Sequence, residues 1–131
     1  MAQSDQLVVV LDFGAQYGQL IARRVRDLNV YSELVPCDIP VDELVAMNPS
    51  AIILSGGPAS VYADDAPDMD ARIFDLGIPI LGFCYGQQIM AVKLGGSVGH
   101  TEVGEYGHAP LQRVGESRLL AETPGEQSVW M

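Results

Sequence analysis

With 131 residues, 48% of them hydrophobic, the chain is long enough to form one domain with a hydrophobic core. Seventeen acidic residues against seven basic ones give a net charge of −10, which argues against binding to nucleic acid or to an anionic membrane. Two cysteines are too few for a disulfide framework or a zinc site, and we expect no metal in this domain.

The first half of the sequence alternates strand and helix patterns. A nearly continuous β-favouring run predicts a strand over 7–13, buried on both faces. Apolar residues at steps of three and four predict an amphipathic helix over 16–28, with arginines on its other side. A strand over 30–35 and a weak helix over 42–47 follow, before the buried strand 51–54.

The second half begins in the same way and then changes. The acidic stretch 64–70 is expected to start a helix, and 78–83 reads as a buried strand that leads into another helix after Cys84. Beyond these elements, short strands are expected over 97–103 and 109–114. The last residues, 127–131, read as a strand, and because the chain stops inside it we expect a fragment of a longer protein.

This order of elements predicts the fold class. Strands that alternate with helices indicate right-handed crossovers and a parallel sheet. We therefore expect an α/β protein with three layers, in which a mostly parallel sheet carries helices on both faces, truncated at its C-terminal side. The whole chain, 1–131, is expected to form a single, incomplete domain. A polar start over 1–6 and the lack of a long apolar run indicate neither a signal peptide nor a membrane span, so we expect a cytoplasmic protein.

One motif predicts the chemistry. Cys84 stands between Gly82 and Gly86, after a predicted strand and before a predicted helix. This is the context of a nucleophile elbow, a sharp turn whose central residue is strained and whose neighbours must be small. At the start of a helix, unpaired N–H groups and the helix dipole stabilise a thiolate. A lone cysteine is more often a core residue, but this spacing favours a nucleophile.

A second loop supplies a partner for this nucleophile. Attack of a thiolate on a carboxamide produces an oxyanion, and in an elbow the N–H of the next residue, here Tyr85, stabilises it. The loop 55–58, Ser-Gly-Gly-Pro, follows a neighbouring strand, and its Gly57 is our candidate for the second donor. The glycines are not followed by Lys-Ser or Lys-Thr, so this loop does not read as a phosphate-binding loop.

A cysteine nucleophile also requires a base, which is usually histidine. His100 and His108 are the two histidines of the chain, and both lie in the irregular region after the elbow. In a strand, His100 and Glu102 would share one face, as an orienting pair does, but a packed or solvated histidine is the commoner case. We therefore assign neither histidine a role.

Together these segments resemble the class I glutamine amidotransferase family over essentially the whole chain. The elbow with Gln88, the loop 55–58 and the Asp-Phe-Gly sequence at 12–14 carry this resemblance. The segments 11–17, 21–26, 53–62 and 105–107 are similar to those of the GMP synthase branch of the family.

The resemblance implies roles for particular residues. Cys84 would attack the side-chain amide of L-glutamine and form a glutamyl thioester, which water hydrolyses after ammonia has left. Gly57 and Tyr85 would provide the oxyanion N–H groups, and Gln88 would help to hold the substrate. The histidine and glutamate of the family's catalytic triad match no position in this sequence. On its own the chain is therefore expected to have little activity.

The resemblance also implies a partner. In the GMP synthase branch, the ammonia aminates XMP to GMP on an ATP-pyrophosphatase (synthetase) domain or subunit that uses ATP and Mg²⁺, and nothing in this chain resembles that domain. No cofactor is expected here, and a homodimer formed through other regions is left open. The alternatives are a glutaminase domain of another class I amidotransferase, a non-catalytic module that docks on a synthetase, and an unrelated cysteine hydrolase of the same architecture.

Overall fold

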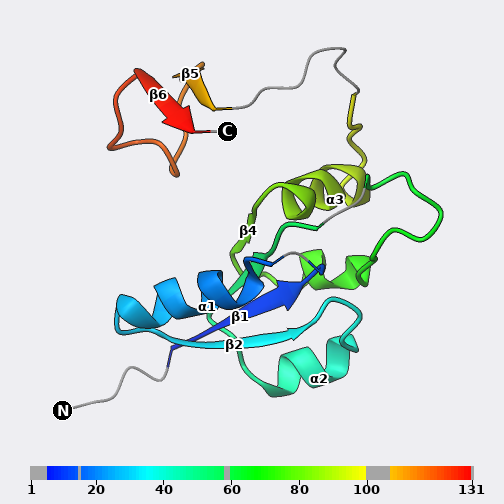
Figure 1. Ribbon diagram of the computed structural model, residues 1–131. Coiled ribbons are helices and arrows are strands. Elements are labelled where there is room, and N and C mark those ends of the chain that lie inside the picture. Colours follow the sequence, from blue (N-terminus) through cyan, green and yellow to red (C-terminus); the bar gives the residue numbers. More distant parts are fainter. Residues whose placement is uncertain (1–5, 15, 58–59, 100–106, 131) are drawn as a thin grey trace. The chain divides into compact units, whose positions relative to one another are not determined.

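The computed structural model describes residues 6–14, 16–57, 60–99 and 107–130 (Figure 1). Within it, the chain forms two compact units, Met1–Val98 and Gly99–Met131. The first unit carries the predicted sheet and the elbow, and the second carries a hairpin. The prediction of a single domain over the whole chain stays a prediction.

A parallel sheet of four strands forms the centre of the first unit (Figure 1). Its order is β2 (Tyr31–Pro36), β1 (Leu7–Asp12), β3 (Ala51–Leu54) and β4 (Ile80–Gly82). β1 pairs with β2 over six residues, whereas β4 pairs with β3 over only three. All four strands were predicted from sequence, and their carboxyl ends meet at one edge. In open α/β sheets, ligands bind outside this edge.

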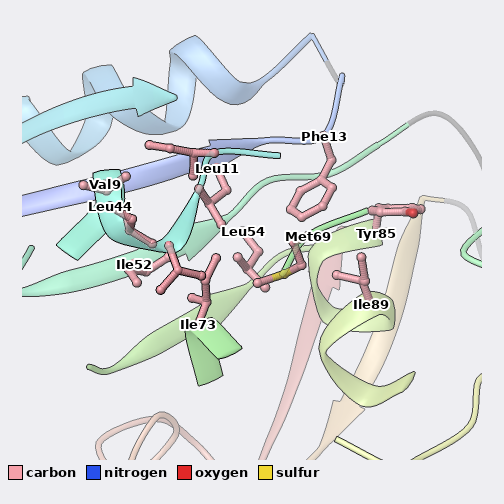
Figure 2. Close-up of a cluster of buried hydrophobic side chains, with 12 residues drawn as sticks. Val9, Leu11, Phe13, Leu44, Ile52, Leu54, Met69, Ile73, Tyr85 and Ile89 are labelled. Carbon is pink, nitrogen blue, oxygen red and sulfur yellow. The ribbon is translucent and has the colours of Figure 1, made fainter. Parts of the chain in front are cut away.

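Helices cover both faces of this sheet, as predicted. Side chains alternate along β1, so Val9 and Leu11 point to one face and Val10 to the other. The first face carries the main core, where buried apolar residues from β1, β3, α2 (Val41–Ala46) and α3 (Tyr85–Lys93) pack together (Figure 2). On the other side, α1 (Gly18–Asp27) lies against β1 and β2 and buries Ala22 (Figure 1).

One predicted helix is absent. The acidic stretch 64–70 contains no helix, and a single short 3-10 turn, η1 (Ala71–Asp75), follows it. Carboxylates concentrated in so few residues repel one another, and Pro67 in the middle of the stretch interrupts any helical pattern. Part of the expected apolar face is still formed, because Met69 and Ile73 are buried in the core.

Asp70 caps this turn and gives it a measurable pH dependence. Its carboxylate accepts hydrogen bonds from the guanidinium and from the backbone N–H of Arg72, which lower the pKa of Asp70 from 3.8 to about 2. Because the folded value is the lower one, the stabilisation is complete above pH 3.8 and is lost as the pH falls through about 2. We expect an NMR titration of the folded protein to place the Asp70 midpoint near this lower value.

The control for this titration is Asp70→Asn, which keeps an oxygen acceptor for the Arg72 N–H and removes the charge. This variant should lack the part of the acid-dependent loss of stability that comes from Asp70, and it should keep the part that comes from other carboxylates such as Asp68. A folded-state midpoint at the ordinary aspartate value would contradict the prediction.

The second unit contains an antiparallel pair, β5 (His108–Gln112) with β6 (Glu126–Trp130). His108 lies opposite Trp130, and their rings meet edge to face at 4.8 Å between centroids. The strands expected over 109–114 and 127–131 are thus confirmed over 109–112 and 127–130, whereas residues 113 and 114 lie beyond the end of β5. Residues 97–99 form no strand, and 100–103 lie outside the described residues.

Candidate functional site

The elbow has the strained backbone that the sequence predicts. Cys84 lies between β4 and α3 with φ 50° and ψ −113°, a conformation that few non-glycine residues adopt. The thiol is solvent-exposed at the N-terminal end of α3. Exposure and the positive end of a helix dipole are the conditions under which a cysteine reacts as a thiolate.

The two flanking glycines allow this turn because there is no room for a side chain at either position. A β-carbon on Gly82 would lie 2.8 Å from the backbone nitrogen of Gln87, and one on Gly86 would lie 2.6 Å from the β-carbon of Leu54. Contacts this short do not occur between real β-carbons and their neighbours. Close packing of the first turn of α3 on β3 and β4 therefore holds Cys84 in its strained conformation.

Gly57 and Tyr85, the two candidate oxyanion donors, lie next to each other. A β-carbon on Gly57 would be 3.0 Å from the Cγ atom of Tyr85 and 3.0 Å from the carbonyl oxygen of Phe13. Within the described part of the chain, neither the Gly57 N–H nor the Tyr85 N–H donates to another group. The loop after β3 and the elbow thus meet at the carboxyl edge of the sheet, where Gly57 lies against the side chain of Tyr85.

The sequence reasoning missed Ser55, which connects two strand ends at this edge. Ser55 is fully buried, and its Oγ accepts a hydrogen bond from the N–H of Phe13 (2.9 Å) and donates one to the carbonyl oxygen of Gly56 (3.0 Å). A signal was present in the sequence, because a serine directly after a buried strand must find partners for its hydroxyl.

The tyrosine side chain after the nucleophile was also missed. Tyr85 is buried, its ring packs on Phe13 at 5.3 Å between centroids, and its hydroxyl donates to the carbonyl oxygen of Pro67. Burial, with the nearby charge of Asp68, raises the pKa of Tyr85, so the phenol stays protonated as this donation requires.

An ion pair joins the same loop to the other end of α3. Lys93 Nζ lies 2.8 Å from the carboxylate of Asp68. Burial acts to raise the pKa of Asp68, but hydrogen bonds from Lys93 and from the N–H of Met69 outweigh it, so the pKa is lowered. The hydroxyl of Tyr62 accepts from the N–H of Val98, so the loop 60–68 is attached to α3 and its flank at three points.

Gln88, His100, Glu102 and His108 were also singled out from the sequence. Gln88 is half-buried in the first turn of α3, where its N–H donates to the carbonyl of Cys84 at 3.1 Å. His100 and Glu102 lie outside the described residues. His108 belongs to the second unit, where it packs on Trp130.

Comparison with known proteins identifies the family. The family model for class I glutamine amidotransferases matches residues 9–131. The chain belongs to the class I glutamine amidotransferase family. Among its amidotransferase relatives, the glutamine-hydrolysing GMP synthase of Streptomyces avermitilis is 56% identical over 131 residues, which are 99% of this chain and 25% of the relative. The GMP synthase of Bifidobacterium longum is 56% identical over 124 residues, 95% of this chain and 23% of the relative.

A solved structure supports the amidotransferase fold. A protein from Thermoplasma acidophilum, described as a candidate GMP synthase subunit, superposes with a TM-score of 0.81 at 30% identity, covering 95% of this chain and 63% of that one. The chain spans about a quarter of the length of the curated relatives above. Among the described residues there is no helix long and apolar enough to cross a membrane, and no cluster of three or more His, Cys, Asp or Glu side chains suited to a metal ion.

Proposed function

We propose that this chain is the glutamine-hydrolysing part of a GMP synthase, with Cys84 as the nucleophile. The observation that carries the proposal is the exposed Cys84 thiol in a left-handed elbow, next to Tyr85, whose side chain packs against Gly57. The choice among amidotransferases rests on GMP synthase relatives that are 56% identical over nearly the whole chain.

The geometry supports acyl transfer to sulfur. The Cys84 thiolate would attack the amide carbon of glutamine, forming a carbon–sulfur bond while the carbonyl electron pair moves onto oxygen. The N–H groups of Gly57 and Tyr85 would donate to that oxyanion. When the oxyanion collapses, the carbon–nitrogen bond breaks, and the nitrogen takes up the proton that the thiol gave up and leaves as ammonia. Water then hydrolyses the glutamyl thioester to glutamate and the free thiol.

Other residues would bind the substrate, and a partner would use the product. Gln88, half-buried one turn after the nucleophile, is the candidate for a contact to glutamine. Because the relatives are GMP synthases, the ammonia would pass to a synthetase domain or subunit that aminates XMP with ATP and Mg²⁺. Within this chain we propose no cofactor, and we place the reaction in GMP biosynthesis in the cytoplasm.

Protection of Cys84 from alkylation tests this proposal. In the protein expressed from its complete gene, a glutamine-like chloroketone should alkylate Cys84, and L-glutamine should slow that reaction by about tenfold when it is present at ten times its Kd. D-Glutamine and L-asparagine should give no protection. Peptide mapping of the alkylated sites includes Cys37 as an internal control. Burial, with the charge of Asp38, raises the pKa of the Cys37 thiol, so this thiol stays mostly protonated and should react slowly.

The result also separates the alternatives. Alkylation without protection by glutamine would overturn the substrate and favour an unrelated cysteine hydrolase. Protection without any hydrolysis of glutamine would favour the non-catalytic module. Hydrolysis that supports an amination other than that of XMP would point to another class I amidotransferase.

A further inference from the structure

We propose that Ser55 is a positioning residue that fixes the orientation of the peptide between Gly56 and Gly57. The inference rests on the proposed function, in which the N–H of Gly57 donates to the oxyanion. Ser55 would not touch the substrate. It would act through the peptide that carries this donor.

The hydrogen bonds of Ser55 leave its hydroxyl a single orientation. The side chain is fully buried, so it has no contact with bulk water. Its oxygen accepts from the N–H of Phe13 at 2.9 Å, and a backbone N–H cannot serve as an acceptor in return. The hydroxyl proton is therefore directed to its other neighbour, the carbonyl oxygen of Gly56, at 3.0 Å.

Holding this carbonyl also determines the direction of the Gly57 N–H. The two groups belong to one planar trans peptide, in which the C=O and N–H bonds point in opposite directions. A peptide between two glycines has unusually free rotation on both sides, because neither residue has a β-carbon. The hydrogen bond from Ser55 is thus a restraint that the glycines themselves cannot provide.

The same hydroxyl connects the loop to the elbow. Phe13, which donates to Ser55, packs its ring on Tyr85, and the carbonyl of Phe13 lies against Gly57. Ser55, Phe13, Gly57 and Tyr85 therefore form a closed set of contacts across the carboxyl ends of β1, β3 and β4. Through this set, the two candidate oxyanion donors are held at a fixed position relative to each other.

The test compares Ser55→Ala with Ser32→Ala in the protein expressed from its complete gene. Ser32 is a matched control, since it is also fully buried and its Oγ donates to a backbone carbonyl, that of Ala22, away from the elbow. For Ser55→Ala we expect kcat for glutamine hydrolysis to fall about 10- to 100-fold with KM nearly unchanged, because a misdirected donor acts mainly in the transition state. Ser32→Ala should keep wild-type kcat.

Two reagents separate positioning from folding. Iodoacetamide alkylates the thiol by direct displacement without an oxyanion, so its rate at Cys84 should match that of the wild type. The γ-semialdehyde of glutamate forms a tetrahedral adduct with an oxyanion, so it should bind Ser55→Ala about 10- to 100-fold more weakly. Ser55→Thr keeps the hydroxyl and should recover most of the loss.

Several results would overturn the inference. These are wild-type kcat in Ser55→Ala, an equal loss in Ser32→Ala, or a parallel loss of alkylation by iodoacetamide. If Ser55→Ala does not fold, the test rests on Ser55→Thr, which keeps the hydroxyl. A Ser55→Thr variant that folds but shows a large loss of kcat and weak binding of the semialdehyde would contradict the role of the hydroxyl. Absence of glutamine hydrolysis in the wild-type protein would instead refute the proposed function.

Discussion

Replacing Cys84 by alanine should abolish glutamine-dependent amination, with a loss of at least about 10⁴-fold in kcat, because the elbow then has no thiol to form the thioester. Synthesis supported by added ammonia should continue at the wild-type rate, since it bypasses the elbow. The measurement is the initial rate of product formation with glutamine and with ammonium salt, in the protein expressed from its complete gene.

Cys37→Ala is the control for this experiment. Cys37 is the other cysteine of the chain and is half-buried, so its replacement should leave both activities intact. Glutamine use that survives in Cys84→Ala would remove Cys84 from the mechanism. Loss of the ammonia-dependent rate as well would show that the substitution damages the protein more widely.

The second large effect is expected for Gly86→Ala. The new β-carbon would meet the backbone of Leu54 in β3, in contacts that a rigid strand cannot relieve by a side-chain rotation. We expect the free energy of unfolding to fall by about 3 kcal/mol, at the upper end of the usual cost of overpacking. Glutamine hydrolysis should fall with it, because α3 must shift to make room. Urea denaturation followed by circular dichroism measures the first effect.

Gly99→Ala is the matched control. A β-carbon there would meet no atom within 4 Å, and the backbone of Gly99 has no left-handed conformation. Its stability should stay within about 0.5 kcal/mol of the wild type. Equal stability of the Gly86 and Gly99 variants would show that β3 and α3 are packed less closely than these contacts require.

The sheet could be predicted because its strands are short apolar runs between clear breaks. β3 was placed residue for residue, since Ala51–Leu54 is flanked by Pro49 and by two glycines. The helix predicted to start in 64–70 was wrong, because the apolar spacing of Met69 and Ile73 arises from an irregular segment followed by one 3-10 turn. Spacing alone does not distinguish these cases.

The candidate site, like the fold, could be predicted only in part from the sequence. Gly82, Cys84 and Gly86 could be predicted as an elbow because the turn imposes residue types at fixed positions along the chain. The contact between Gly57 and Tyr85 was expected only from the parallel order of the strands. The hydrogen bonds of the Ser55 and Tyr85 side chains were not predicted, since their partners lie 42 and 18 residues away in the sequence. Long-range hydrogen bonds leave no periodic pattern in a sequence.

The three attachments of the loop 60–68 have a consequence for the kinetics of local opening. Pro67, Asp68 and Tyr62 are each bonded to α3 or to the residues just after it, so the loop cannot detach without breaking polar contacts. A segment that lacks regular structure should then exchange its amide hydrogens together with α3, and a protease should cut it only as often as the helix itself opens.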